Sequence, residues 1–285
     1  MRDILILDCK EIGCPEILMF VFVELCKAFE EKGRCVKIIH NLNKLTNNSI
    51  VFMGDVFRST SIPELLNKWA PDAIYIGWYW HKQNTCSLKY FIHTYENMLL
   101  PDKRVVYLKS LTINCPLLLR ASEKPDNVGL EIKQICYDYC YIGYNYLSNW
   151  VPGKNFKGVY IGTNEHKLYL PYNKRKEIYL KSIFALGFQS EENIKNAHVS
   201  QRIFEGLAYG CIVLTNSLPA CEQTNNIAIY VKSKNEIEDI ITVFKENPSM
   251  ITQKQIAGYE FIKRYGTNHN AIQLFTECIK SHFDM

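Results

Sequence analysis

The fold class follows from one segment, His198-Val-Ser-Gln-Arg-Ile-Phe-Glu-Gly-Leu-Ala-Tyr-Gly-Cys-Ile-Val-Leu-Thr-Asn216. Residues 200–209 predict a short helix, because their apolar side chains recur on one helical face. Gly210 follows, at the place where a left-handed C-cap favours a residue without a side chain. The apolar run 211–214 then predicts a buried strand. A helix that leads through glycine into a buried strand is typical of a parallel α/β sheet.

Short apolar runs alternate with longer amphipathic segments along the rest of the chain. Strands are expected at 4–7, 35–39, 49–53, 73–78, 104–108, 140–143, 158–162, 182–187, 211–214 and 227–231. Helices are expected at 16–31, 87–99, 126–136, 169–181, 190–209, 234–245, 249–264 and 268–283. This alternation predicts doubly wound parallel sheets.

The alternation breaks at 149–157, where Pro152-Gly153 lies among polar residues. We place a domain boundary and a hinge there, which gives an N-terminal domain at 1–150 and a second domain at 151–265. The final segment, 266–285, carries one apolar stripe at helical spacing and predicts an amphipathic helix.

A family resemblance lies in Arg202-Ile-Phe-Glu-Gly-Leu-Ala-Tyr-Gly-Cys-Ile-Val-Leu-Thr215. This segment resembles the donor-binding motif of group 1 glycosyltransferases with the GT-B fold, in the short branch that keeps an Arg-x-x-Glu half. Pro219 fits the proline-containing loop that follows the motif. The family's second acid, eight positions before Glu205, is replaced here by Ala197. The match covers about 193–275, whereas the first half agrees only in the order of its elements.

The resemblance implies an α/β chain of two Rossmann-like doubly wound domains that face each other across a cleft. It also implies that segment 266–285 crosses back onto the first domain, which takes the acceptor side. Ligands of such sheets bind beyond the carboxyl ends of the strands, so the cleft is the expected site. The implied activity is transfer of a sugar from a nucleotide diphosphate sugar to a hydroxyl of a glycan, lipid or other glycoconjugate. Two alternatives stay open: a nucleotide-sugar epimerase or phosphorylase of the same fold, and a non-catalytic nucleotide-sugar-binding subunit.

Several side chains of the second half are candidates for binding the nucleotide sugar. The resemblance assigns Glu205 to the ribose, whose diol suits a carboxylate that accepts two hydroxyl hydrogen bonds. Arg202 suits the diphosphate, or it forms a structural pair with Glu205. Lys181, with the basic cluster 174–176, suits the diphosphate as well, or belongs to a solvated helix face. Asn193 lines the base pocket, or lies at an exposed helix start.

The first half offers three further candidates, each beside or after a predicted strand. Gly13 lies in the first strand–helix loop, where the backbone can approach a ligand closely. Asp8 either accepts a sugar hydroxyl or is a loop carboxylate. His81 ends the aromatic run 78–81, and in similar enzymes a histidine near this place faces the donor sugar. The other interpretation of His81 is a residue hydrogen-bonded at the rim of a core aromatic cluster.

The sequence contains no Asp-x-Asp, the motif that holds a diphosphate through a divalent ion in metal-dependent sugar transfer. We therefore expect no metal and no cofactor. Basic side chains and a helix dipole would take the charge of the leaving group instead.

The chain has 285 residues, 47% hydrophobic residues and a net charge of +4. This mild charge predicts no nucleic acid partner and at most peripheral contact with a membrane. Eleven cysteines without CxxC spacing predict free, buried thiols and a reducing compartment. Residues 1–8 do not resemble a signal peptide, so a cytoplasmic location is expected.

Overall fold

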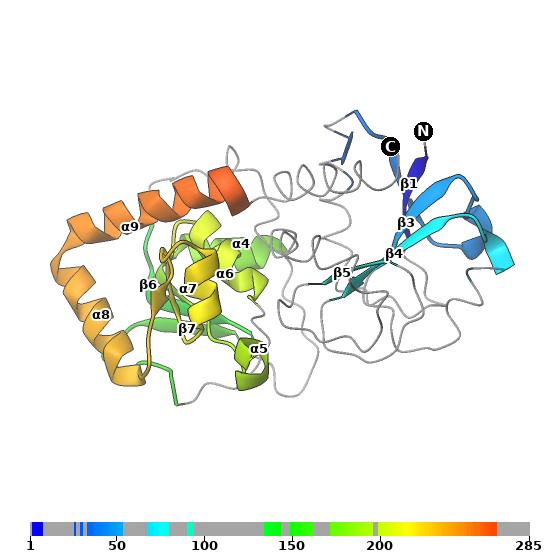
Figure 1. The fold of residues 1–285 in the computed structure, drawn as a ribbon. Coiled ribbons are helices and arrows are strands. Elements are labelled where there is room, and N and C mark those ends of the chain that lie inside the picture. Colours follow the sequence, from blue (N-terminus) through cyan, green and yellow to red (C-terminus); the bar gives the residue numbers. More distant parts are fainter. Residues whose placement is uncertain are drawn as a thin grey trace. The chain divides into compact units, whose positions relative to one another are not determined.

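The computed structural model describes residues 2–7, 26, 29–30, 33–53, 66, 68–79, 90–93, 134–143, 149–161, 172–195 and 199–266. The chain divides into two compact units, one formed by Met1–Leu118 with Asn268–Met285 and the other by Leu119–Thr267. Among the described residues, each unit contains a five-stranded sheet (Figure 1). All strand pairs in both sheets are parallel, as predicted.

The first sheet has the strand order β2-β1-β3-β4-β5. Its strands are β1 (Asp3–Leu7), β2 (Val36–Ile39), β3 (Ser49–Met53), β4 (Ile74–Tyr79) and β5 (Tyr90–His93), with a short 3-10 turn at Leu42–Lys44. The interior strand β1, which lies between β2 and β3, is hydrophobic and its residues Ile4 to Leu7 are buried. A buried interior strand with parallel neighbours on both sides is the expected core of a doubly wound unit.

The helix expected at 87–99 is contradicted by strand β5. Residues Tyr90-Phe-Ile-His93 pair in parallel with β4, from Tyr90 beside Ile76 to His93 beside Tyr79. Aromatic and β-branched residues favour a pleated surface, and pairing with β4 decides the conformation here. The strand expected at 104–108 lies outside the described residues.

The second sheet has the strand order β10-β9-β8-β6-β7. Its strands are β6 (Tyr137–Ile142), β7 (Gly158–Ile161), β8 (Ser182–Leu186), β9 (Ile212–Thr215) and β10 (Ile229–Tyr230). The strand expected at 140–143 is therefore present, but it belongs to the second sheet and not to the first domain.

The predicted hinge at Pro152-Gly153 is corrected by this pairing. The loop at 149–157 joins β6 to β7, which are neighbours in one sheet. Its Pro152 is buried, and the Gly153 N–H donates to Glu238 Oε1 at 2.7 Å. A loop held to its own sheet in this way is not a linker between domains.

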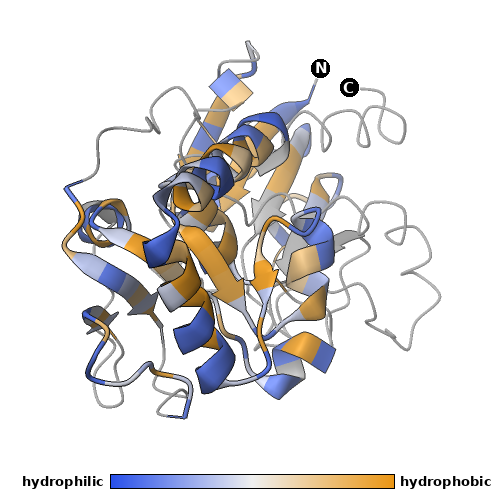
Figure 2. Cartoon of the chain, turned by 90° about the vertical axis from the view of Figure 1, so that its left-hand side faces the viewer, coloured by the Kyte–Doolittle hydropathy of each residue, from blue (hydrophilic) through white to orange (hydrophobic). Residues whose placement is uncertain are grey.

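The helices of the second unit are α4 (Tyr172–Leu180), α5 (Glu191–Lys195), α6 (Gln201–Ala208), α7 (Leu218–Gln223), α8 (Lys234–Glu246) and α9 (Pro248–Phe261), followed by a π-helical turn at Ile262–Gly266. Alternate strand residues point to opposite faces, and both faces are covered. Cys140, Ala185 and Val213 pack with α6 and α9, whereas Phe184 and Leu214 pack with α8. Figure 2 shows these strands as largely hydrophobic beneath helices with hydrophilic outer turns. The second unit is thus doubly wound.

Glycine sets both the end and the packing of α6. Gly210 has φ +70°, which confirms the predicted left-handed C-cap. A Cβ on Gly206 would lie 2.9 Å from Val213 Cγ2 and 3.0 Å from the Ala185 Cβ. Glycine at this position therefore lets α6 lie close to β8 and β9.

Three of the predicted buried thiols are confirmed, since Cys140, Cys211 and Cys221 are buried, but Cys35 is exposed. Burial raises the pKa of Cys221 to about 11. Among the helices that the structure describes, none is long and apolar enough to cross a membrane. The helix predicted at 268–283 lies outside the described residues, so its crossing onto the first domain stays a prediction.

Candidate functional site

The strand order of the second sheet reverses direction between β6 and β8. From β6 the chain adds β7 on one side, and then β8, β9 and β10 on the other side. Ligands of open parallel sheets bind beyond the carboxyl ends of the strands at such a switch point. In this unit the candidate site therefore lies at the carboxyl ends of the strands, where Gly143 follows β6 and residues 187–190 follow β8. We call this side of the sheet its carboxyl edge.

Arg202 lies at this edge, in the first turn of α6. Its Nη1 donates to the Tyr141 hydroxyl and its Nε donates to Ser200 Oγ, both at 3.1 Å. The guanidinium carbon lies 5.5 Å from the centre of the Tyr141 ring. Among the described residues no carboxylate forms an ion pair with Arg202. Its positive charge and the N–H groups of the first turn together favour an anion.

The aromatic support of Arg202 extends to the edge strand β7. Tyr141 stacks on Tyr160 with ring centres 5.2 Å apart and an interplanar angle of 12°. The two tyrosines are also register partners in the β6–β7 pair. This stack limits the motion of the Tyr141 ring and so holds the guanidinium at the carboxyl end of β6.

Gly143 leaves the space that the guanidinium of Arg202 occupies. A Cβ at Gly143 would lie 2.8 Å from the guanidinium carbon and from the Tyr141 hydroxyl, and it would collide with Nη1. We expect Gly143→Ala to displace Arg202 and to weaken nucleoside diphosphate binding about tenfold, the effect of losing one hydrogen bond to a charged group. Titration calorimetry measures this, with Gly153→Ala as the control, because a Cβ there meets Glu238 Oε1 only at 3.5 Å. Unchanged affinity in Gly143→Ala would contradict the placement of Arg202.

Gln189 and Asn216 tie the carboxyl ends of β8 and β9 together. The Gln189 N–H donates to Asn216 Oδ1 at 2.9 Å, and Asn216 Nδ2 donates to the Gln189 carbonyl at 3.0 Å. Gln189 Oε1 accepts from the Ser200 N–H at 3.1 Å. Hydrogen bonds thus run from Asn216 through Gln189, Ser200 and Arg202 to Tyr141. The sequence did not identify Gln189 and Tyr141 as site residues, because nothing marks them there except their positions near the ends of predicted strands.

Glu205 forms a buried ion pair with Arg175 of α4, and not with Arg202. Arg175 Nη1 lies 3.1 Å from Glu205 Oε1 and 3.4 Å from Oε2. Glu205 is 2% exposed. Burial raises the pKa of the neighbouring Tyr179 well above its usual value, and the charge of Glu205 raises it further. The predicted contact of Glu205 with a ribose therefore requires its carboxylate to become accessible when the nucleotide binds.

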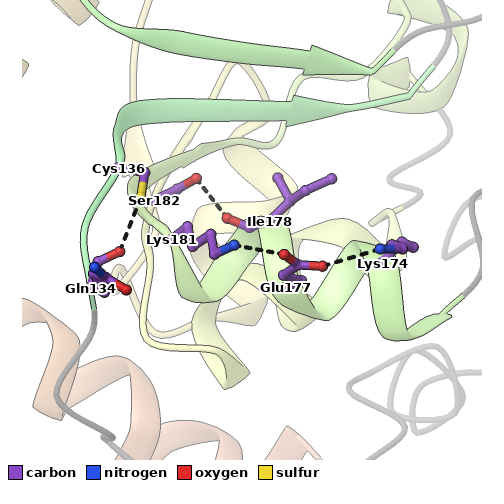
Figure 3. Close-up of polar contacts among 7 residues, drawn as sticks. All are labelled: Gln134, Cys136, Lys174, Glu177, Ile178, Lys181 and Ser182. Atoms are coloured by element: carbon purple, nitrogen blue, oxygen red, sulfur yellow. Dashed lines mark hydrogen bonds and ion pairs between the residues drawn. The ribbon is translucent and has the colours of Figure 1, made fainter.

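Lys181 lies at the opposite edge of the sheet, which contradicts its predicted contact with the diphosphate. It directly precedes β8, and its carbonyl accepts from the N–H groups of Cys136 and Tyr137 at the start of β6. Its amine lies 2.6 Å from Glu177 Oε1, and Lys174 also forms an ion pair with Glu177 (Figure 3). The hydrogen bond from Lys181 lowers the pKa of Glu177. The solvated helix face, the other interpretation of this cluster, fits Lys174 and Lys181, whereas the Arg175 side chain is only 13% exposed.

Asn193 and Pro219 follow the carboxyl ends of β8 and β9. Asn193 is half-buried in α5, and its N–H lies 3.3 Å from Ser190 Oγ. Pro219 was expected in a loop but lies in the first turn of α7, which Ser217 caps by accepting from the Ala220 N–H. Contacts of either residue with a nucleotide stay predictions.

Three candidates of the first half, Asp8, Gly13 and His81, lie outside the described residues. Within the part of the chain that the structure does describe, no group of three or more His, Cys, Asp or Glu side chains is placed to hold a metal ion.

Comparison with known proteins supports the resemblance. Residues 139–276 match the family model described as "Glycosyl transferase-like". An alpha-glucosyltransferase in complex with UDP and a 13-mer DNA containing a HMU base shares 12% identity over 98% of this chain and 99% of its own, with a TM-score of 0.60. An alpha-glucosyltransferase in complex with UDP-glucose and DNA containing an abasic site shares 11% identity over 100% and 98%, with a TM-score of 0.57. No curated protein matches the sequence.

These similarities confirm the predicted resemblance and the GT-B fold class. They also correct one expectation. The mild net charge was taken to exclude a nucleic acid partner, yet both of these similar structures are complexes with DNA. A small net charge therefore does not exclude nucleic acid for this fold.

Proposed function

We propose that this chain, whose residues 139–276 match the glycosyltransferase-like family model, transfers a sugar from a nucleotide diphosphate sugar to a hydroxyl acceptor. The observation that carries the proposal is Arg202. It lies at the switch point of the second sheet, at the start of α6, and no described carboxylate pairs with it. The two sheets and their helices are the scaffold on which similar alpha-glucosyltransferases hold UDP or UDP-glucose.

The proposed chemistry needs a group that stabilises the leaving nucleoside diphosphate. As the bond between sugar and phosphate breaks, negative charge grows on the phosphate oxygen. Arg202 and the N–H groups of the first α6 turn would stabilise that charge in place without reorganising. Glu205, oriented by Arg175, would accept hydrogen bonds from the ribose hydroxyls.

His81 and Asp8 stay the proposed catalytic side chains, and Gly13 a proposed sugar-donor contact. In sequence, Asp8 and Gly13 come after the carboxyl end of β1, and His81 comes after that of β4. Ligands bind at that end of such sheets.

The acceptor hydroxyl belongs to a glycan, a lipid or a nucleic acid. Nucleic acid is included among the candidate acceptors because the similar alpha-glucosyltransferases were solved in complex with DNA, in one case with DNA containing a HMU base. Parallel assays with HMU-containing DNA, unmodified DNA of equal sequence, a sugar acceptor and a lipid acceptor would separate these classes. Transfer to none of them, with only slow hydrolysis of the sugar nucleotide, would argue against all three.

The first test is a screen of nucleoside diphosphates and their sugars by thermal shift. A ligand at 100 times its dissociation constant adds about 2.7 kcal/mol of stability, which is a measurable change. Incubation with the best sugar nucleotide then identifies the activity. Free nucleoside diphosphate with a glycosylated acceptor supports transfer. An epimerised donor, or binding without turnover, would replace the proposal by one of the two alternatives.

We propose that the transfer needs no divalent metal. The sequence lacks Asp-x-Asp, and Arg202 supplies positive charge at the carboxyl edge of the sheet, where the phosphate is proposed to bind. Activity is therefore expected to persist within about twofold in excess EDTA, since the charge on the leaving group is met by the protein. Complete loss on chelation that Mn²⁺ or Mg²⁺ reverses would contradict this proposal.

A further inference from the structure

Gln189 carries a buried amide nitrogen that makes no hydrogen bond within the described part of the chain. The residue is 7% exposed, and Nε2 has no acceptor there. The other polar atoms of Gln189 are engaged: the backbone N–H and carbonyl with Asn216, and Oε1 with the Ser200 N–H. A buried donor left without an acceptor is unfavourable, so Nε2 stands out in an otherwise complete network.

The orientation of this amide is determined by its partner. Exchanging oxygen and nitrogen would place two donors, Nε2 and the Ser200 N–H, against each other. Oε1 must therefore face Ser200, the N-cap residue of α6, and Nε2 is the atom left to donate. Ser200 begins α6 and also bonds to Arg202, so Gln189 is joined through one residue to the helix start and to the guanidinium.

We infer that Gln189 is a further binding residue for the sugar nucleotide, and that its Nε2 donates a hydrogen bond to an oxygen of the diphosphate beside Arg202. This inference rests on the proposed function and names one more group of that site. Ser200 links the two residues, because its N–H donates to Gln189 and its Oγ accepts from Arg202. Asn216 fixes the Gln189 backbone from β9, so the amide is held in place before the ligand arrives.

A phosphate oxygen is the acceptor that suits this position best. The helix start and Arg202 both attract negative charge, and a diphosphate offers several oxygens to donors of different kinds. A neutral amide adds a directed hydrogen bond without adding charge. The ligand would thereby give Nε2 the acceptor that the described chain does not provide.

Two variants and one control test the inference. Gln189→Glu keeps an oxygen for the Ser200 N–H but removes the Nε2 donor, whereas Gln189→Met removes both. Gln223→Met is the control. Its amide oxygen is also buried without a hydrogen-bond partner among the described residues, but it lies at the last residue of α7. Affinity for the best of UDP, GDP, CDP and ADP, and for the matching nucleoside, is measured by titration calorimetry at pH 8.

Gln189→Glu is expected to bind the diphosphate at least about ten- to a hundredfold more weakly, because it loses a hydrogen bond to a charged group and its carboxylate repels the phosphate. The buried carboxylate should also lower its melting temperature. Its affinity for the nucleoside should not change. Gln189→Met should lose the same affinity and also melt at a lower temperature, and Gln223→Met should bind as the wild type does. Wild-type affinity in Gln189→Glu, or an equal loss for the nucleoside, would overturn the inference alone. A wild-type chain that binds no nucleoside diphosphate would overturn the proposed function itself.

Discussion

Replacing Arg202 with alanine is expected to lower the affinity for a nucleoside diphosphate by about a hundredfold or more and to reduce sugar transfer below detection. Each hydrogen bond to a charged group contributes about 1.5–3 kcal/mol, and a guanidinium contacts phosphate with two of them. The variant should fold, because among the described residues the side chain bonds to Ser200 and Tyr141 alone, at the carboxyl ends of the strands. Titration calorimetry and release of nucleoside diphosphate measure the two effects.

Two comparisons show whether the effect belongs to Arg202. Arg202→Lys keeps the charge but loses the planar guanidinium that can donate two parallel hydrogen bonds. We therefore expect an intermediate loss of nucleoside diphosphate affinity, about tenfold. Lys181→Ala removes a cation from the amino edge of the same sheet, where Lys181 binds Glu177, and should change nothing. An equal loss in Lys181→Ala would mean that the phosphate does not bind at the carboxyl edge.

Most buried strands could be predicted from sequence because they are short apolar runs between polar ends. Strands β1, β3, β8 and β9 lie within a residue of their expected positions. The partners of a strand could not be predicted this way. Strand β6 was recognised as a strand, but only its pairing with β7 and β8 places it in the second sheet. Local pattern also failed at β5, where pairing overrides a segment that shows helical spacing.

The site was predictable only where a residue type and a motif coincide. Arg202 was found through the Arg-x-x-Glu spacing. Arg175 is one of three consecutive basic residues. Only the structure shows that its side chain is enclosed, whereas that of Lys174 is exposed. Gln189 belongs to no motif, and its significance depends on an amide atom whose surroundings only the fold defines. The error at Lys181 was avoidable, since a residue directly before a parallel strand lies at the edge away from the ligand.

Breaking the buried pair of Arg175 and Glu205 is expected to destabilise the second unit strongly. Removing one partner of a buried ion pair leaves a charge without compensation and costs about 3–5 kcal/mol. Both side chains are largely enclosed, with 13% and 3% of their surface exposed. Glu205→Ala and Arg175→Ala should therefore each shift the midpoint of urea unfolding to lower concentration. A matched exposed pair provides the control: Lys174→Ala, which breaks a surface contact with Glu177, should shift it little.

A double variant then separates the structural role of Glu205 from its proposed contact with the ribose. Arg175→Met with Glu205→Leu replaces the pair by apolar side chains, and such replacements are often neutral or stabilising. Most of the lost stability should therefore return. Nucleotide affinity should stay about tenfold or more below the wild type, because no carboxylate remains to accept the ribose hydroxyls. If the double variant regains both stability and wild-type affinity, Glu205 serves only to join α4 to α6, and the ribose must be bound elsewhere.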